Sequence, residues 1–276
     1  MDSGQLQKGI KAGIGFLTTI PVGVDEAGFG IFTENIHIFV IVGAIAGLLL
    51  GATGFILGSF MPVKLVPVLM VAAIFLLTGI NHLDGLSDTG DGIIASGTRE
   101  KKVAAMKDVH AGAGGILFIG MDLLFIFSAV SLFAGFGSVY LMIGLFVAEV
   151  CAKLSMTTVA AFGKSLHPGM GSMFIEKTKK EHYLIGLAIA IIACMAAMSL
   201  PLLPFIQPYF WRPYGGILLI LAGFLAAAAS VGVGLIMVDI ANDNFGGVNG
   251  DVMGAANEIG RIVALVILGT LIWMLW

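Results

Sequence analysis

The stretch IHIFVIVGAIAGLLLGATGFILGSF, residues 36–60, decides the fold class of this chain. It contains no Asp, Glu, Lys or Arg, and it exceeds the roughly 20 mostly apolar residues that a helix needs to cross a bilayer. The chain of 276 residues is 58% hydrophobic and only 11% charged, with a mean hydropathy of +1.04. Because such a composition leaves too little polar surface for a water-soluble domain, the sequence predicts an integral membrane protein.

Further apolar runs follow the same pattern. They cover residues 63–80, 114–134, 138–162, 183–203, 214–238 and 259–276. Together with residues 36–60 they predict an all-α, polytopic bundle of about seven transmembrane helices. Six or eight spans stay open as alternatives, because the first of these runs is short and the run at 214–238 is rich in Gly and Ala. We find no repeat and no soluble segment, so residues 1–276 are expected to form a single integral membrane domain.

The N-terminal segment is expected to lie outside the bundle. Gly and Pro interrupt its first 30 residues, which lack the apolar core of a cleavable signal peptide. Residues 9–22, GIKAGIGFLTTIPV, are moderately amphipathic, which favours a helix in the membrane interface. The two cysteines, Cys151 and Cys194, fall inside predicted spans and indicate neither a disulfide framework nor a zinc site.

The distribution of basic residues predicts the orientation. With seven spans, the N-terminus and residues 81–113, 163–182 and 239–258 lie on one side of the membrane. Eleven of the 14 Lys and Arg residues then share that side if Arg261, just inside the start of the last span, is counted with it; the other ten are Lys8, Lys11, Arg99, Lys101, Lys102, Lys107, Lys164, Lys177, Lys179 and Lys180. Because cytoplasmic segments carry the excess of Lys and Arg, we expect this side to face the cytoplasm.

Three carboxylates lie in NHLDGLSDTGDGI, residues 81–93, directly after an apolar run. Asp84, Asp88 and Asp91 are spaced i, i+4 and i+7, so they share one face if the preceding helix continues through them. Their repulsion near a low-dielectric boundary is relieved by protonation or by a bound cation, and Mg²⁺ commonly joins carboxylates to substrate phosphates. The alternative is an ordinary acidic loop at a membrane exit, although acidic residues in such places usually carry function.

A basic segment, ASGTREKKVAAMKDVHAGAGGI, follows at residues 95–116. Thr98 is placed to cap a short helix that holds Arg99 and leads to Lys107. Basic side chains next to a carboxylate–metal cluster suit a phosphate-bearing substrate, and anchoring against anionic lipid is the alternative for the lysines. Asp108 and His110 precede a glycine run, where a single His is more often structural than catalytic.

A second acidic, glycine-rich segment, DIANDNFGGVNGDVMGAANEIGR, covers residues 239–261. Asp251 and Glu258 are spaced i, i+7 on a helix that is expected to run into the last span. Two such segments on one side of the membrane are what a metal-centred site between helices requires. The alternative is a solvated loop in which Asp251 caps a helix.

Glu149, Lys153 and Asp122 lie well inside predicted spans. Glu149 and Lys153 are spaced i, i+4, and we expect them to pair with each other in a structural role. Asp122 has no obvious partner in the sequence, and its role stays open; such residues normally face the bundle interior.

Four motifs occur in order along most of the chain. They are FLTTIPV at 16–22, NHLDGLSDTGDG at 81–92, TREKKVAAMKDVHAGAGG at 98–115 and GGVNGDVMGAANEIGR at 246–261. With these motifs the chain resembles the cobalamin synthase family, adenosylcobinamide-GDP ribazoletransferase. The Asp-Gly-Leu-x-Asp-Thr-x-Asp block is the specific part of the resemblance.

Three positions depart from the pattern of that family. Asn249 stands where the family usually has Thr, and Val109 and His110 stand where Ser and Arg are usual.

The resemblance implies a Mg²⁺-dependent phosphotransferase that completes the nucleotide loop of cobalamin. A ribose hydroxyl of α-ribazole, or of its 5′-phosphate, attacks adenosylcobinamide-GDP at the phosphorus attached to cobinamide, and GMP leaves.

The resemblance and the residues above together predict the site. The expected Mg²⁺ ligands are Asp84, Asp88, Asp91 and Asp251. The expected phosphate contacts are Arg99, Lys107, Gly246, Gly247 and Gly250. The expected catalytic residues are Asp88, Asp108 and His110, the last two as candidates for the base that accepts the hydroxyl proton.

The partners expected are the two small-molecule substrates and membrane lipid, with no nucleic acid; a homo-oligomer stays open. The expected location is the cell membrane, with the active site facing the cytoplasm. A cation-coupled transporter is the alternative function, but it predicts ionisable residues near the bilayer midplane and pseudo-symmetric halves. The acidic residues here cluster at one membrane face, and a non-catalytic scaffold would leave the two acidic segments without a purpose.

Overall fold

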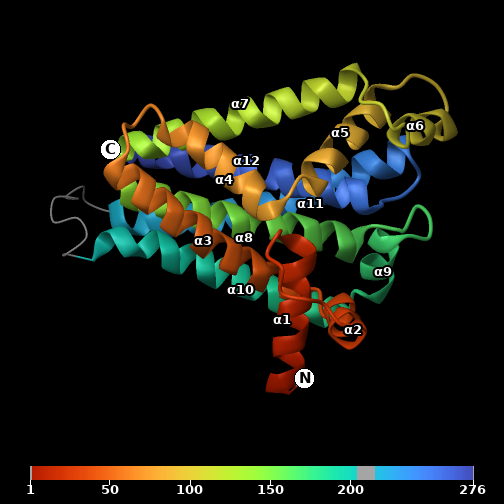
Figure 1. Cartoon of the computed structure of the whole chain (residues 1–276), viewed down its shortest axis with the longest axis horizontal. Helices are drawn as coiled ribbons and strands as arrows, with labels where there is room; N and C mark the ends of the chain where they lie inside the picture. Colours follow the sequence, from red (N-terminus) through yellow and green to blue (C-terminus); the bar gives the residue numbers. More distant parts are fainter. Residues whose placement is uncertain (1, 204–214, 276) are drawn as a thin grey trace.

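The computed structural model describes residues 2–203 and 215–275, which form an almost entirely helical protein (Figure 1). The helices are α1 (Ser3–Leu17), α2 (Glu26–Glu34), α3 (His37–Phe60), α4 (Val66–Thr78), α5 (Asn81–Ile94), α6 (Arg99–Met106), α7 (Ala113–Phe136), α8 (Ser138–Phe162), α9 (Met170–Lys177), α10 (Lys180–Ser199), the 3₁₀ turn η1 (Leu200–Leu202), α11 (Gly215–Asn244) and α12 (Gly250–Leu275). The predicted connection at 204–213 lies outside the described residues.

Long apolar helices confirm the predicted class. Within the described residues, six helices are long and apolar enough to cross a membrane, namely α3, α7, α8, α10 with η1, α11 and α12, and α4 with α5 makes up to seven. In Figure 1 the six long helices run roughly along the long axis of the molecule. The α5–α6, α8–α9 and α11–α12 connections gather at one end, and the α3–α4 and α7–α8 connections lie at the other with the C-terminus. This arrangement agrees with the predicted division of the connections into two groups.

Helix α8 forms the centre of the bundle, and α3 packs directly on its backbone. Three glycines of α3 repeat every fourth residue, and a Cβ at Gly43, Gly47 or Gly51 would lie 2.8 Å from a backbone oxygen of α8. Small residues at this spacing let helix backbones approach closely in a membrane, where packing takes over from the hydrophobic effect. Large apolar side chains cover the outside of the bundle. Leu48 and Ile192, for example, are 63% and 68% exposed, as expected for side chains that face lipid.

The second predicted span is broken, which corrects the expectation that its helix continues through residues 81–94. Helix α4 has only 13 residues, about 20 Å of helix, and α5 leaves it at 96°. The break occurs at Gly79, which has a φ of 70°, a conformation that residues with a side chain rarely adopt. Thr19 stabilises the end of α4 at this break: its N–H donates to the Leu77 carbonyl at 2.8 Å, and its hydroxyl donates to the Leu76 carbonyl at 2.6 Å.

Helix α11 continues to Asn244, beyond the predicted end of its span at 238. Helix α12 begins at Gly250 and carries Asp251 and Glu258 into the last span, as predicted. Asn249 explains the start of α12, since its side chain accepts the Val252 N–H at 3.1 Å as an N-cap. Most of the second acidic segment therefore belongs to helix ends, and only the turn at 245–249 connects them.

Helix α1 lies crosswise to the long helices, close to α2 and α3 (Figure 1). Its capping box is complete: Asp2 accepts the Gln5 N–H at 2.7 Å, and the Gln5 side chain accepts the Asp2 N–H at 3.2 Å. A crosswise amphipathic helix is the geometry expected of an element in the membrane interface; its insertion there stays a prediction.

Candidate active site

Helix α5 carries the three predicted carboxylates. Its 14 residues are helical from Asn81 to Ile94, so Asp84, Asp88 and Asp91 share a face although α5 does not continue α4. Asp84 is exposed, whereas Asp88 and Asp91 are partly buried. The stripe therefore runs from the protein surface into the contacts that α5 makes with its neighbours.

Helices α5 and α12 cross at very short range. A Cβ at Gly85 would lie 2.8 Å from the carbonyl oxygen of Asp251, and a Cβ at Gly254 would lie 3.2 Å from the backbone of His82. These two glycines leave no space for side chains at the crossing. The crossing places Asp84, which is next to Gly85, beside the start of α12 and Asp251.

A cavity of about 300 Å³ adjoins this crossing. It is lined by Phe16, Phe39, Asn81, His82, Asp84, Met156, Met170, Gly171, Phe174, Gly250, Asp251 and Met253. Of the four predicted metal ligands, Asp84 and Asp251 line it, and they come from segments more than 160 residues apart in the chain. The two acidic segments therefore each contribute one carboxylate to the wall of the same cavity.

Asp251 has a defined orientation and positive neighbours. The Asn249 amide donates to Asp251 Oδ2 at 2.7 Å, so the residue that caps α12 also positions the carboxylate. The charges of Lys107, and of His167 when it is protonated, act favourably on Asp251, whereas that of Asp84 opposes it. A cluster of carboxylates with a lysine at its edge can hold a cation and a phosphate together.

Asp91 has a structural role that the sequence did not reveal. Its Oδ2 accepts the N–H of Gly112 at 2.8 Å, and its Oδ1 accepts the N–H of Gly115 at 2.9 Å. Asp91 therefore caps the N-terminus of α7, where a negative charge also interacts favourably with the helix dipole. Asp88, one turn earlier, lies within range of the charges of Asp84, Asp251 and Asp91.

The carboxylates do not form a preassembled cage. In residues 2–203 and 215–275, no group of three or more His, Cys, Asp or Glu side chains is arranged to hold one metal ion. Mg²⁺ is usually held by one or two carboxylates with waters and substrate phosphates, and Asp84 with Asp251 offers such a pair. The residues present fit a Mg²⁺ ion that binds with its substrate, and the predicted four-ligand set stays a prediction.

The basic segment forms the predicted short helix, and two of its basic side chains contact the end of α11. Helix α6 starts after Thr98, although the Thr98 side chain makes no capping hydrogen bond. Arg99 Nε donates to the Asp243 carbonyl at 3.2 Å, and Lys102 Nζ donates to Asn244 Oδ1 at 2.6 Å. These two residues hold the C-terminal end of α11, which leaves Lys107 as the basic residue whose charge reaches Asp251.

The two predicted bases point to solvent. The His110 ring contacts Asp108 at 3.0 Å between Nδ1 and Oδ1, and the two side chains are 88% and 58% exposed. Hydrogen bonds from the backbone N–H and the ring of His110 hold the pKa of Asp108 below its usual value, which makes it a weaker base. Neither residue lines the cavity.

The three predicted glycines differ in their surroundings. Gly246 has a φ of 89° and forms the turn after α11. A Cβ at Gly247 would lie 2.7 Å from the Lys164 carbonyl oxygen, so this residue is needed for packing between two connections. Gly250 alone lines the cavity, at the first turn of α12, where unpaired backbone N–H groups favour an anion.

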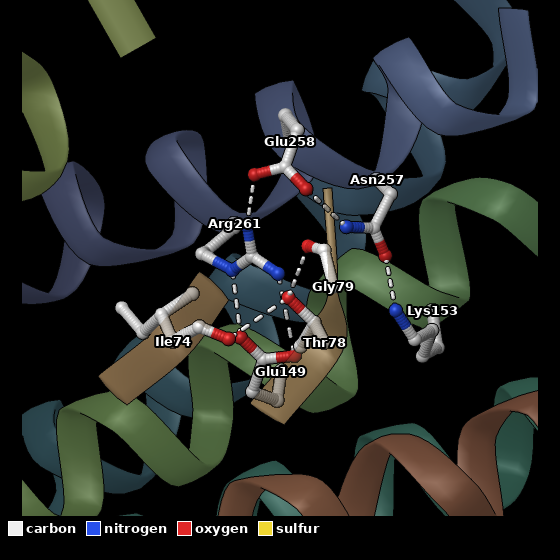
Figure 2. A network of polar contacts seen from close by, with 8 residues as sticks. All are labelled: Ile74, Thr78, Gly79, Glu149, Lys153, Asn257, Glu258 and Arg261. Atoms are coloured by element: carbon white, nitrogen blue, oxygen red, sulfur yellow. Dashed lines mark hydrogen bonds and ion pairs between the residues drawn. The ribbon is translucent and has the colours of Figure 1, made fainter. Parts of the chain in front are cut away.

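A buried ionic network lies between α8 and α12, close to the end of α4 (Figure 2). Arg261 Nε donates to Glu149 Oε1 at 2.6 Å, and Arg261 Nη1 forms a second ion pair with Glu258. The predicted Glu149–Lys153 pair is therefore wrong: Lys153 Nζ donates to Asn257 Oδ1 at 2.6 Å. The geometry of α8 permitted the i, i+4 pair, but α12 supplies a guanidinium that contacts Glu149 through two nitrogens.

Asp122 of α7 faces the interior, as predicted. It is 1% exposed, and neither of its oxygens has a hydrogen-bond partner among the described residues. The charges of Glu258 and Arg261 act on it, so it belongs to the surroundings of the same network.

Several residues of the site were not predicted. His82 is part of the aspartate signature, yet its burial and its place on the cavity wall follow only from the crossing of α5 and α12. Phe16 belongs to a motif for which the sequence suggested no role. His167 precedes Pro168 in a connection, and nothing in its surroundings in the sequence indicates that it lies near Asp251.

Comparisons with known proteins agree on one family. The family model described as "Cobalamin-5-phosphate synthase" matches residues 9–269. A Methanocella arvoryzae protein named adenosylcobinamide-GDP ribazoletransferase is 51% identical over 99% of this chain and 99% of its own length. Proteins of the same name from Methanosarcina barkeri and Pyrococcus furiosus are 38% and 37% identical, over 95% and 76% of this chain and 91% and 80% of theirs. No solved structure matches the chain significantly.

Proposed function

The chain belongs to the cobalamin-5-phosphate synthase family, and we infer that it is an enzyme, an adenosylcobinamide-GDP ribazoletransferase. It joins adenosylcobinamide-GDP to α-ribazole, or to α-ribazole 5′-phosphate, and releases GMP. The observation that carries this conclusion is the 51% identity to a ribazoletransferase over the full length of both chains. The lining of one cavity by Asp84 and Asp251 supports it.

The reaction transfers the cobinamide-bearing phosphoryl group from a pyrophosphate to a ribose hydroxyl. The ribose hydroxyl oxygen of ribazole forms a bond to the phosphorus attached to cobinamide, and the bond from that phosphorus to the bridging oxygen breaks. The electron pair of the broken bond leaves with GMP, and the hydroxyl gives up its proton. Such a reaction mainly needs positioning of the two substrates and stabilisation of charge on the phosphate oxygens.

We assign the phosphate-facing site to Asp84, Asp88 and Asp251. Mg²⁺ held by these carboxylates would neutralise charge on the pyrophosphate. Asn249 orients Asp251, and Lys107 supplies a positive charge beside it. Arg99 and Lys102 are assigned to the folding of this region, because their contacts are to the end of α11.

The proton of the ribose hydroxyl goes to a carboxylate of the cavity in this proposal. A general base must lie within hydrogen-bond reach of the proton that it accepts. Asp108 and His110 are exposed and bonded to each other outside the cavity, whereas Asp84 and Asp251 are on its wall. We therefore propose Asp84 or Asp251 as the base in place of the two residues that the sequence suggested.

The site faces the cytoplasm in our proposal. The end of the bundle that carries α5, α6 and the start of α12 (Figure 1) is also the end that holds most of the Lys and Arg residues, and cytoplasmic segments carry this excess. A cation-coupled transporter is not favoured, because the acidic residues that line the cavity belong to the end of the bundle and the family is one of ribazoletransferases.

An assay of the purified protein tests the proposed function. The protein, in detergent or nanodiscs, is supplied with adenosylcobinamide-GDP, α-ribazole and Mg²⁺, and GMP is quantified by chromatography. We expect GMP and the cobamide product in equal amounts, no GMP when α-ribazole is omitted, and loss of turnover with EDTA that added Mg²⁺ restores. Absence of GMP from folded protein would refute the proposed activity, and full turnover in EDTA would refute the role of Mg²⁺.

A further inference from the structure

The cavity at the α5–α12 crossing has two chemically different ends. The residues Phe39, Met156, Phe174 and Met253 of its lining are at most 4% exposed, so they form the inner end. The exposed residues of its lining are Asn81, Asp84, Met170 and Gly250, so they form the opening. A ligand that fits must therefore be apolar at one end and polar at the other.

The inner end is built for a flat aromatic group. Phe174 lies 5.3 Å from Phe16 and 5.0 Å from Phe39 between ring centroids, and all three rings line the cavity together with the thioethers of Met156 and Met253. Aromatic rings and Met sulfur atoms make favourable contacts with the faces and edges of heterocycles. The aromatic side chains come from α1, α3 and α9, so three elements outside the α5–α12 crossing shape this end.

His82 adds a polar group to the same wall. It is only 7% exposed, and its Nδ1 has no hydrogen-bond partner among the described residues. Buried polar atoms in folded proteins are almost always hydrogen-bonded. A ligand in the cavity that carries a hydroxyl or a ring nitrogen would provide the missing partner.

The volume selects between the two substrates. At about 300 Å³ the cavity lies at the lower limit of ligand pockets, which hold roughly 300–1,000 Å³. A nucleoside fits this volume, whereas adenosylcobinamide-GDP, which carries a corrin ring and two nucleosides, does not. Two other cavities, of about 300 and 630 Å³, are lined by apolar side chains except for Asp122 in the larger one, and neither combines an aromatic wall with carboxylates at its opening.

We propose that this cavity is the acceptor subsite, which holds the heterocyclic base of α-ribazole among Phe16, Phe39 and Phe174 and leaves its ribose at the opening beside Asp84 and Asp251. His82 is a positioning residue that bonds the acceptor through Nδ1. This inference rests on the proposed function and gives a role to the FLTTIPV motif, whose first residue is Phe16. Adenosylcobinamide-GDP then approaches the carboxylates from outside the cavity.

Phe16 is the residue on which to test the subsite. Base–aromatic stacking is worth enough that Phe16→Ala is expected to raise both the Kd and the KM for α-ribazole by about tenfold. The KM for adenosylcobinamide-GDP should change less than about twofold, because this substrate binds outside the cavity in our proposal. Phe16→Leu keeps an apolar side chain and protects the fold, and it should raise the same two constants severalfold. The Kd is measured by calorimetry with α-ribazole alone, and the KM values come from GMP release.

Phe29→Ala is the matched control. The Phe29 ring packs on Phe16 and Phe174 at 5.7 and 6.2 Å between centroids, yet it does not line the cavity. Its truncation should lower stability without changing the Kd for α-ribazole. His82→Leu should weaken α-ribazole binding, and His82→Asn, which retains a polar group near the position of Nδ1, should restore part of it.

Two results would overturn the inference. One is an unchanged Kd for α-ribazole in Phe16→Ala and Phe16→Leu; the other is a rise in the KM for adenosylcobinamide-GDP alone. The proposed function fails separately, if the wild-type protein releases no GMP. The calorimetric Kd still tests the subsite in that event, because it needs no turnover.

Discussion

Gly85 of α5 lies directly against the backbone of Asp251 at the start of α12, so closely that a Cβ at Gly85 would lie 2.8 Å from the Asp251 carbonyl oxygen. This contact fixes the distance between the two helices that carry the carboxylates of the cavity. Activity should therefore depend on a residue that has no side chain.

Gly85→Ala tests this dependence. A methyl group at this position forces α5 and α12 apart, and overpacking of this kind costs about 1–3 kcal/mol of stability. A displacement of about 1 Å in an active site can lower the rate about 100-fold, so we expect a loss of GMP release far larger than the loss of folded protein. The measurements are the melting temperature in detergent and kcat.

Gly120→Ala is the control for that substitution. Gly120 is also inside a helix, α7, but a Cβ there has no atom within 4 Å. Its activity and melting temperature should remain near wild type. Equal activities in the two variants would show that the close crossing does not matter for the reaction.

Asp91→Asn separates capping from metal binding. The two carboxylate oxygens of Asp91 each accept one backbone N–H group of α7, whereas Asn has only one oxygen that can accept. The substitution should therefore cost about 1 kcal/mol of stability, as the weakening of a helix cap does. The Mg²⁺ concentration for half-maximal GMP release should stay within about twofold of wild type, because the principal role assigned to Asp91 is structural. A large increase in that concentration would show instead that Asp91 is a metal ligand.

Arg261→Met tests the buried network (Figure 2). It leaves Glu149 and Glu258, each 1% exposed, without their guanidinium partner. Removing one partner of a buried ion pair typically costs about 3–5 kcal/mol, so we expect little folded protein and a much lower melting temperature. Lys177→Met is the control, because Lys177 and Glu34 pair at the surface at 4.0 Å, where ion pairs contribute little. A wild-type melting temperature in Arg261→Met would contradict the role of the network.

Cysteine labelling tests the orientation. The native Cys151 and Cys194 are both buried and free, so labelling of an added cysteine should stand out. In intact cells an impermeant maleimide should label Met61→Cys, at the α3–α4 connection, and should reach Ser96→Cys only after the membrane is made permeable. The opposite pattern would place the site outside the cell.

The helices were predictable from the sequence because the apolar runs are long. A run such as 36–60 leaves no other fold in a membrane. The break at Gly79 was not predictable, since a single Gly after an apolar run is also tolerated within a helix. Only the contacts of Thr19 with the end of α4 show why the chain turns there.

The candidate site shows what residue spacing indicates and what it does not. The spacing of Asp84, Asp88 and Asp91 indicated one helical face, yet it could not show that Asp91 caps α7. In the same way, the i, i+4 spacing of Glu149 and Lys153 suggested a local pair, whereas the partners come from α12. Residue spacing within a helix indicates which contacts are possible, and tertiary packing determines which of them form.

The rate of GMP release by Asp84→Asn tests the central claim most directly. Asp84 is exposed at the opening of the cavity, and no hydrogen bond or ion pair in the described part of the chain holds its carboxylate, so the substitution should leave the fold intact. Asp243→Asn, which changes an exposed carboxylate at the same end of the bundle but outside the cavity, is the control. We predict that Asp84→Asn lowers GMP release by about 100-fold or more, the loss of a few kcal/mol of transition-state stabilisation, while Asp243→Asn retains it. Turnover near wild type in folded Asp84→Asn would contradict the assignment of this cavity as the centre of phosphoryl transfer.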